Sequence, residues 1–444
     1  MPFTESNGRG AVRRGVLLLA GWLCLPLLAH AQPTIEHWET DNGARVYYVR
    51  APELPMVDLR VALDAGSARD GEHHGLAALT ARMLERGTAH RDEEVIAEEL
   101  EAVGAELSVS TGRDTASVSL RSLARDEVLD GAMDVFADVL GRPTFPRAAF
   151  ERERRRTLVG IERSRQDPGT VASKTFHQTL YGEHPYAHPV RGRKATVEAL
   201  ERDQLAAFHQ RYYVAANAVV AIVGDVERQR AEELAEQATA HLERGEAAKA
   251  LPEVPALEEA RTEHVDFPAG QIHLLAGQPG MARGDDDYWA LFVGNHVLGG
   301  SGFGSRIMDE IREERGLAYS AYSYFQPRAR KGPFIMGLQT RTDQAGEAEE
   351  VLRDTLERFI EEGPSKEELK RSRDNLVGGF PLRIDSNSKI LGYLAMIGFH
   401  ELPLDYLDRF VENIEAVSAE DIRDAFQRRV DPDRLLVVTV GRRE

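Results

Sequence analysis

The chain has 444 residues, of which 42% are hydrophobic and 29% are charged, and its formal net charge is −18 at pH 7. This length exceeds what one hydrophobic core usually covers, so we expect two or more domains in an ordinary globular protein. Acidic residues outnumber basic ones and are intermixed with them, which argues against nucleic acid and anionic membrane surfaces as partners.

The N-terminal segment has the pattern of an export signal. Two arginines precede an apolar run from Val16 to Leu28, and small residues flank His30 just before the expected cut. This predicts a secretory signal peptide over residues 1–31, cleaved after Ala31, and a periplasmic location for the mature chain. An uncleaved anchor is the alternative, but the run is short for a membrane span, and no stable membrane insertion is expected elsewhere. The single cysteine, Cys24, lies in this segment, so we expect neither a disulfide nor a thiol nucleophile in the mature protein.

After residue 32, strand patterns alternate with helix patterns. Short β-rich runs predict strands, and periodic apolar runs predict helices. The predicted strands cover residues 46–49, 57–63, 106–110, 115–120 and 218–223, and the predicted helices cover residues 75–84, 95–103 and 125–165, the last interrupted near Pro143 and Pro146. This mixture indicates an α+β domain over residues 33–242.

A helix-then-strand unit occurs twice. Residues 205–212 form a helix pattern that leads to an apolar strand ending at Gly224. Near the C-terminus, residues 422–429 lead in the same way to an apolar strand ending at Gly441. Such units are common, but the matched lengths of the two halves favour an internal duplication over chance similarity.

The two halves are separated by a change in composition. Residues 243–260 are rich in Ala, Glu and Pro, which is typical of a linker. A second domain is then predicted over residues 261–444. We therefore expect an α+β fold in which two homologous α/β halves enclose a cleft.

The segment from Gly75 to Thr88 resembles the signature helix of the pitrilysin, insulinase and mitochondrial processing peptidase family, whose active members are inverted zincins. In that helix the motif is His-x-x-Glu-His: the two histidines share one helical face and bind zinc, and the glutamate is the general base for zinc-bound water. Here Ala78 and Arg82 stand at the histidine positions and Ala81 at the glutamate position. The resemblance places the third ligand, a glutamate in active members, at Gly160. We therefore expect no catalytic zinc in this chain, and a cation at Arg82 would oppose one.

Other histidines do not suggest a replacement metal site. His73 and His74 are adjacent, so their side chains point in different directions. His184 and His188 have helical spacing, but a proline follows each of them and disfavours a helix. We expect all four to be loop or packing residues. An unrecognised zinc site in this chain is the alternative.

The second half contains a segment from Asn295 to Ser320 that closely resembles the second-half signature of the same family. The pattern predicts a helix from about Ser305 to Arg315, because Gly316 is a good residue to end it. A strand is expected to begin near Ala318. This resemblance is the more specific of the two, and together they cover roughly residues 35–444.

Arg312 and Tyr319 match, in type and in their seven-residue spacing, an arginine and a tyrosine that in this family contact the peptide backbone near the scissile bond. The resemblance implies the same role here. A guanidinium donates in a fixed fork, and a phenol can hydrogen-bond a carbonyl that gains negative charge. We expect both side chains to project to the same side of the turn. The alternative is that Arg312 pairs with Asp309 on an exposed helix face and that Tyr319 fills the core.

A glycine-rich stretch precedes this helix. It comprises Gly299, Gly300, Gly302, Phe303 and Gly304. No Lys-Ser/Thr pair follows it, as a phosphate-binding loop would require. The stretch resembles the segment with which the non-catalytic subunit of mitochondrial processing peptidase handles substrate, so these residues are predicted to bind substrate. A flexible lead into the helix is the alternative.

These resemblances predict a non-catalytic subunit of a periplasmic heterodimeric zinc metallopeptidase, inactive alone. A homologous partner would supply zinc, and this chain, which would need no cofactor, would supply Arg312 and Tyr319 at the partner's zinc site. The substrate would be an oligopeptide or an unfolded polypeptide. A stand-alone peptide-binding or scaffolding protein without peptidase activity is the alternative.

Overall fold

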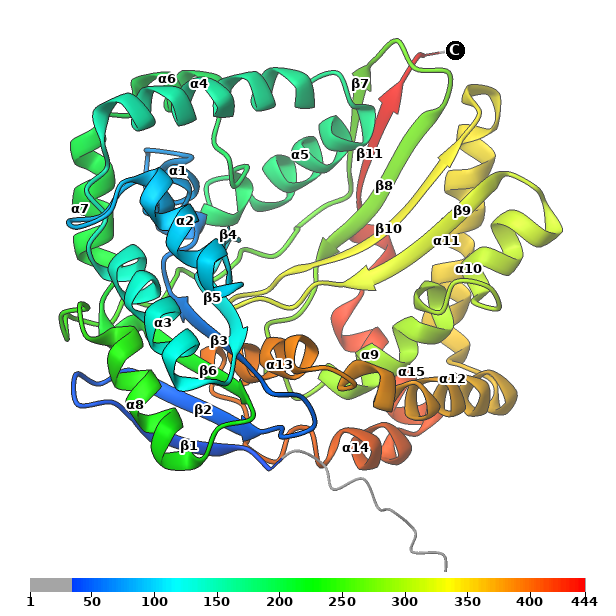
Figure 1. Ribbon diagram of the computed structural model, residues 1–444. Coiled ribbons are helices and arrows are strands. Elements are labelled where there is room, and N and C mark those ends of the chain that lie inside the picture. Colours follow the sequence, from blue (N-terminus) through cyan, green and yellow to red (C-terminus); the bar gives the residue numbers. More distant parts are fainter. Residues whose placement is uncertain (1–33, 444) are drawn as a thin grey trace, which may run out of the picture. The chain divides into compact units, whose positions relative to one another are not determined.

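The computed structural model describes residues 34–443, so the predicted signal peptide lies outside the described residues. The described strands form two sheets (Figure 1). The first sheet has the order β1-β2-β6-β3-β5-β4 and consists of β1 (Glu36–Glu39), β2 (Arg45–Arg50), β3 (Met56–Leu63), β4 (Glu106–Thr111), β5 (Ala116–Leu123) and β6 (Ala218–Gly224). The second has the order β7-β11-β8-β10-β9 and consists of β7 (Arg261–Asp266), β8 (Ile272–Pro279), β9 (Ala318–Phe325), β10 (Pro333–Thr340) and β11 (Leu436–Gly441).

The two sheets share one topology. In the first sheet β2 pairs with β6 in parallel, and β6, β3, β5 and β4 then pair antiparallel in that order. In the second sheet β7 pairs with β11 in parallel, and β11, β8, β10 and β9 follow antiparallel in the same sense. Only the additional edge strand β1 distinguishes them among the described residues. This strand-by-strand match confirms the predicted duplication.

The helices follow the same order in both halves, except that α8 after β6 has no counterpart after β11 among the described residues. The first half contains α1 (Leu76–Met83), α2 (Glu93–Val103), α3 (Asp126–Gly141), α4 (Arg147–Ser164), α5 (Pro168–Tyr181), α6 (Lys194–Ala199), α7 (Arg202–Tyr212) and α8 (Arg228–Thr239). The second half contains α9 (Tyr288–Asn295), α10 (Arg306–Met308), α11 (Ala345–Glu362), α12 (Lys366–Gly378), α13 (Asn387–Phe399), α14 (Phe410–Ala416) and α15 (Ala419–Arg429). The predicted break between α3 and α4 is confirmed, with Pro146 as the N-cap of α4.

Each half contributes one helix to the sheet of the other half. In Figure 1, α5 of the first half lies alongside β11, and it packs on β11 and β8. Conversely, α13 of the second half packs on β6, β3 and β2 of the first sheet. The α+β class and the two homologous halves are as predicted, and this exchange of helices joins the halves through their cores.

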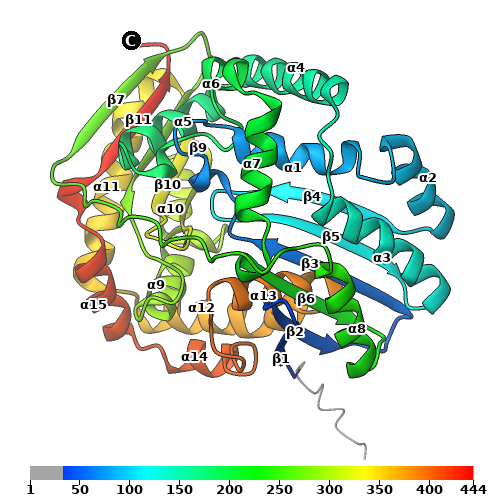
Figure 2. The ribbon, with the colours of Figure 1, turned by 90° about the vertical axis from the view of Figure 1, so that its left-hand side faces the viewer.

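Successive side chains of each strand point to opposite faces of the first sheet, and both faces are covered. Val46, Val61 and Val220 point into a core built with helices of the same half. Figure 2 looks onto this face, with α3, α7 and α8 drawn over the strands. The alternate residues, such as Tyr47 and Val219, point into a core shared with α13. Burial on both faces accounts for the nearly continuous apolar sequence of β6.

The exchanged helix α13 approaches the first sheet closely at a glycine. A Cβ atom at Gly398 would lie 2.5 Å from Val219 Cγ1 and 2.6 Å from Tyr47 Cε2, whereas a Cβ at Gly392 of the same helix would have no heavy atom within 4 Å. We expect Gly398→Ala to lower the free energy of unfolding by about 1–3 kcal/mol through overpacking. Gly392→Ala should instead raise it by up to about 1 kcal/mol through helix propensity. Urea unfolding of the two variants measures this difference, and equal effects would contradict the packing.

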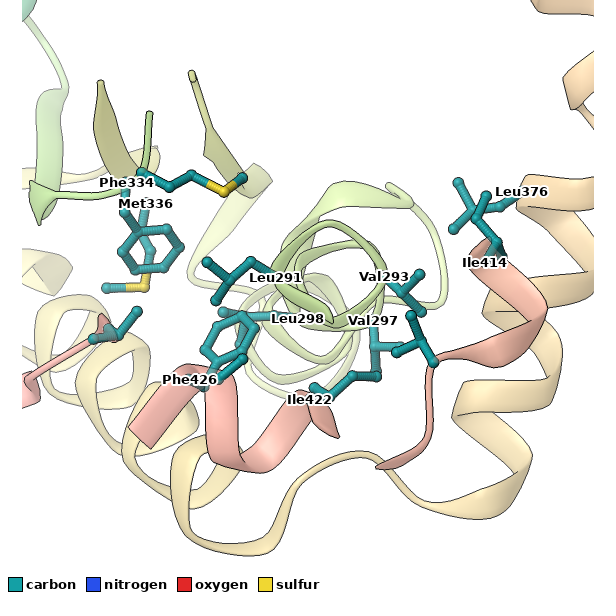
Figure 3. Packing of buried hydrophobic residues seen from close by; sticks show 14 of the residues in the cluster. Leu291, Val293, Val297, Leu298, Phe334, Met336, Leu376, Ile414, Ile422 and Phe426 are labelled. Carbon is teal, nitrogen blue, oxygen red and sulfur yellow. The ribbon is translucent and has the colours of Figure 1, made fainter. Parts of the chain in front are cut away.

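The core of the second half is organised around α9 (Figure 3). Leu291, Val293, Val297 and Leu298 are each at most 4% exposed. They pack among side chains of β10, α12, α14 and α15, labelled in Figure 3 as Phe334, Met336, Leu376, Ile414, Ile422 and Phe426. This packing fixes the chain immediately before the glycine-rich stretch.

The segment between the halves contains neither helix nor strand from residue 243 to residue 260. It is nevertheless packed, because Leu251, Val254 and Leu257 are buried in a cluster with α5 and β11. The Nη1 of Arg69 also donates to the carbonyl oxygen of Lys249 at 2.6 Å. The domain boundaries at this segment remain a prediction. Over residues 34–443, no helix is both long enough and apolar enough to cross a membrane.

Candidate functional site

The signature helix α1 is held at its start by a carboxylate. Buried Asp70 accepts hydrogen bonds from the backbone N–H groups of Gly75 and Ala77, both at 2.7 Å. Burial raises the pKa of Asp70 to about 7, although these two hydrogen bonds act in the opposite direction. The cap satisfies two of the free N–H groups at the helix start and fixes the position of α1.

The four positions that hold the zinc ligands and the general base in active family members lie on α1 and α4. Ala78 and Ala81 are buried, and the side chain of Arg82 is 41% exposed. Gly160 lies on α4, where a Cβ atom would meet no heavy atom within 4 Å. None of these side chains has an atom that can bind zinc, so the residues present do not fit the metal.

In place of a metal cluster, this region contains a buried carboxylate surrounded by arginines. The side chain of Glu153 on α4 is 2% exposed, and Arg156 donates to its Oε1 at 2.7 Å. Three further guanidinium nitrogens, from Arg86, Arg152 and Arg82, lie 3.6, 3.7 and 4.0 Å from its oxygens. Glu153 and Gly160 are separated by roughly two helical turns and so share a face of α4. Arg82, at a histidine position of the motif, therefore contributes to neutralising a buried negative charge.

The four histidines considered as ligands are part of loop packing. His184 Nδ1 accepts from the backbone N–H of Tyr186 at 3.1 Å, and its Nε2 donates to Pro252 O at 3.0 Å. His188 stacks on His74 with ring centroids 3.3 Å apart, and both ring nitrogens of His73 lie 3.3 Å from Gln204 Nε2. Within the described residues, no three His, Cys, Asp or Glu side chains are grouped as a metal site requires.

The glycine-rich stretch of the second half begins inside the π-helical turn η5 (His296–Gly300) and leads to α10, which continues into a second π-helical turn, η6 (Asp309–Glu314). The predicted helix from Ser305 to Arg315 is therefore present but begins as α10 and continues with π winding, a feature frequent at functional sites. Gly316 ends it with φ +63°, and β9 begins at Ala318, both as predicted.

Glycine is required at these positions, either because another segment lies too close for a Cβ atom or because the backbone has a positive φ. A Cβ at Gly299 would lie 2.5 Å from the backbone nitrogen of Ser323, and one at Gly300 would lie 2.8 Å from Asn295 Nδ2. Gly302 and Gly304 have φ of +67° and +86°, which other residues rarely adopt. The stretch is thus a defined turn pressed against β9.

Arg312 and Tyr319 lie together on one side of the turn, as their spacing predicts. The guanidinium carbon of Arg312 is 4.6 Å from the centre of the Tyr319 ring and 4.7 Å from that of Phe303. Both rings are largely exposed, Tyr319 by 82% and Phe303 by 71%. Tyr319 does not fill the core, and the acidic neighbour of Arg312 is Glu313 at 3.4 Å rather than Asp309. The alternative for this pair is therefore wrong in both parts, whereas peptide contact remains a prediction.

A pocket of 420 Å³ opens beside Tyr319, between the second sheet and the N-terminal turns of α5. We call it the aromatic pocket; its lining includes Tyr319, Tyr322, Tyr324, His273, Gly169 and Ser173. The ring of Tyr322 lies across Gly337 of β10, where a Cβ would be 2.6 Å from the phenol oxygen. Both halves contribute residues to this pocket, and a cleft enclosed between the halves remains a prediction.

An ion pair fixes the start of the Arg312 helix. Arg306 donates to both carboxylate oxygens of Glu368 at 2.6 and 2.9 Å, and Glu368 also accepts from the N–H of Ser365 at 2.8 Å. Burial opposes ionisation of Glu368, but these hydrogen bonds outweigh it and lower its pKa to about 2.

A lowered folded-state pKa means that the charged form of Glu368 stabilises the fold. This stabilisation is present above the unfolded pKa near 4.5 and is lost as the pH falls toward 2. We expect Glu368→Gln to lower the melting temperature at pH 6. We also expect the melting temperature of this variant to fall less steeply than that of the wild type as the pH is lowered below 4.5. The neighbouring Glu367→Gln should change neither. An equally steep fall in Glu368→Gln, followed by circular dichroism, would contradict this.

Three features of the region were not identified from sequence. They are the arginine cluster around Glu153, the aromatic pocket, and the contact of Phe303 with Arg312. The spacing of Tyr322 and Tyr324 by two residues on a predicted strand was a usable signal, because it places both on one face. The cluster gave no such signal, since Arg152 and Arg156 share α4 with Glu153 but Arg82 and Arg86 come from the distant α1 segment.

Comparison with known proteins supports the family resemblance and the fold. Residues 45–194 match the family model described as insulinase (peptidase family M16), and residues 199–376 match that described as peptidase M16 inactive domain. The crystal structure of a peptidase M16 inactive domain from Pseudomonas fluorescens is 38% identical, with a TM-score of 0.89 over 92% of this chain and 98% of that one.

Two curated relatives have contrasting names. An uncharacterized zinc protease of Streptomyces coelicolor is 29% identical over 437 residues, covering 95% of this chain and 91% of the relative. A non-peptidase homolog of Helicobacter pylori is 27% identical over 407 residues, covering 90% and 92%. With matches to both family models, a duplicated topology and no zinc-binding side chain at its signature positions, this chain belongs to the insulinase family, peptidase family M16.

Proposed function

We propose that this chain is the non-catalytic subunit of a periplasmic heterodimeric zinc metallopeptidase and that Arg312 and Tyr319 bind the peptide at the partner's zinc site. The observation that carries the proposal is the exposed cluster of Phe303, Arg312 and Tyr319, in a chain whose own signature helix lacks every metal-binding group. An arginine in contact with two exposed rings, at the surface of the chain, is accessible to a bound peptide.

The first half gives this chain no means of activating water. Ala78 and Ala81 offer only methyl groups, and Arg82 brings a positive charge near Glu153. A hydrolytic zinc site needs nitrogen or oxygen ligands and a base for the bound water. We infer that the chain is inactive alone; the relative from Helicobacter pylori is named a non-peptidase homolog.

The second half offers groups suited to an extended peptide. Tyr319 stands at the start of β9, an edge strand of the second sheet as the described residues form it. An extended segment can add to such an edge through backbone hydrogen bonds, while pockets beside it select side chains. The Arg312 guanidinium and the Tyr319 hydroxyl can then donate to a peptide carbonyl, and the aromatic pocket lies next to them.

The experiment is a purification of the full chain, carrying a C-terminal tag, from its own cells. We expect a copurifying homologous chain with an intact His-x-x-Glu-His helix, about one zinc per heterodimer, and peptide cleavage that a chelator abolishes. The tagged chain alone should contain no zinc and cleave nothing.

Each other outcome supports a different function. A chain that binds peptides but purifies without a peptidase would be a stand-alone binding or scaffolding protein. One zinc per isolated chain, with cleavage, would instead establish a metal site of its own. Either result would overturn the proposal.

A further inference from the structure

A second pocket, of 380 Å³, lies against the same helix α5 as the aromatic pocket. We call it the cationic pocket; its lining includes Arg113, Asp167, Gly169, Ser173, Lys174 and His177. Gly169 and Ser173 line both pockets, so the two are contiguous along the first turns of α5.

Arg113 carries a positive charge that the described residues do not pair. Its Nε donates to the backbone carbonyl of Tyr186 at 3.1 Å, and it makes no ion pair with a carboxylate of residues 34–443. Burial and the neighbouring cation Arg328 lower the pKa of Arg113 to about 10. A buried guanidinium beside another cation favours the arrival of an anion.

Lys174 adds a second charge of the same sign. Its ammonium donates to Ser164 Oγ at 2.8 Å, and burial together with Arg165 and Arg191 lowers its pKa. The one carboxylate that lines the pocket, Asp167, accepts from the N–H of Thr170 at 2.6 Å as the N-cap of α5. The pocket is therefore locally positive in a chain whose net charge is −18.

His177 contributes an unsatisfied acceptor. The residue is 7% exposed, and burial followed by the charge of Arg113 lowers its pKa to about 3, so the ring is neutral. Its Nδ1 donates to Ser173 O at 2.9 Å, which leaves Nε2 as the acceptor of the ring. That Nε2 has no hydrogen-bond partner among the described residues. A buried polar atom without a partner is costly, so a ligand with an N–H or O–H donor would relieve it.

We propose that the cationic pocket binds the C-terminal α-carboxylate of a peptide, which pairs with Arg113 and Lys174 while the amide N–H of the terminal residue donates to His177 Nε2. A peptide terminus places an anion and an N–H donor within one residue, which matches two cations beside one acceptor. The contiguous aromatic pocket then receives a bulky apolar side chain near that terminus. The inference rests on the peptide binding proposed above and names which end of the peptide the chain holds.

The test compares two fluorescein-labelled decapeptides of alanine with a final phenylalanine, one ending in a free carboxylate and the other in an amide. Fluorescence anisotropy with the wild-type chain should show about tenfold tighter binding of the acid, the usual effect of a charge-assisted pair. N-Acetyl-phenylalanine should compete, and N-acetyl-phenylalanine amide and inorganic phosphate should compete far less.

Two lysine variants test whether Lys174 causes the preference for the peptide with a free carboxylate. Lys174→Met should remove most of the preference for the acid, whereas Lys370→Met, an equal charge change at an exposed site on α12, should leave it intact. Circular dichroism checks that both are folded. Equal binding of acid and amide, or an unchanged preference in Lys174→Met, would overturn the carboxylate site and leave peptide binding standing. Phosphate competing as well as the acid would indicate a general anion site instead. If neither peptide bound, peptide binding itself would fail.

Discussion

In the proposed heterodimer, Arg312→Ala should lower peptide cleavage by about tenfold to a thousandfold, because it removes a donor to a developing negative charge. The guanidinium lies over both the Phe303 and the Tyr319 ring, and these contacts favour one orientation of its donors. Its loss removes both the donors and the group that orders the two rings. The measurement is kcat/KM of the complex with a fixed peptide at constant zinc content.

Matched variants separate this role from a general loss of charge. Arg315→Ala removes an arginine from the same turn that pairs with Glu310, and it should leave cleavage within about twofold because surface pairs contribute little. Arg312→Lys retains the charge without the planar fork and should recover only part of the activity. Full activity in Arg312→Ala would remove the assigned role.

The largest stability effect is expected at Glu153. Glu153→Gln should lower the free energy of unfolding by about 3 kcal/mol, because four arginines around one buried carboxylate would lose their counter-charge. Glu93 would remain as the partner of Arg86 and Arg152, which limits the loss. Urea unfolding monitored by circular dichroism measures the change.

Glu151→Gln on the same helix is the control. Glu151 pairs with Arg154 at 2.7 Å, but its side chain is 35% exposed, so the change should stay within about 1 kcal/mol. Arg82→Met should also cost little, since its guanidinium is the most distant of the four from Glu153. A Glu153→Gln protein as stable as Glu151→Gln would show that the arginines need no buried carboxylate.

Local sequence signals predicted the elements that carry the site. Gly316 marked the end of the Arg312 helix, and the seven-residue spacing placed Arg312 beside Tyr319 across the turn. The duplicated helix-and-strand unit predicted β6 and β11 as equivalent strands, and their pairing confirms it. These features depend on residues close together in the chain, where capping and periodicity act.

Features built from distant segments could not be predicted in the same way. Nothing in residues 387–399 indicates that α13 covers the sheet of the other half, because an apolar helix face does not specify its partner. The π winding of η6 was also missed, since no sequence rule separates it from an α-helix over so few residues. Arg113 and His177 both line the cationic pocket although they are 64 positions apart in the sequence. No spacing pattern in the sequence shows that they lie together.

The most direct test of the proposed inactivity of this chain is peptide hydrolysis by the isolated chain, assayed with and without added zinc and chelator. We expect no cleavage above the buffer rate under any of these conditions, because Ala78, Ala81, Arg82 and Gly160 provide no group to hold or activate a water-bearing metal ion. Zinc-dependent cleavage by the chain alone, abolished by the chelator, would contradict the account.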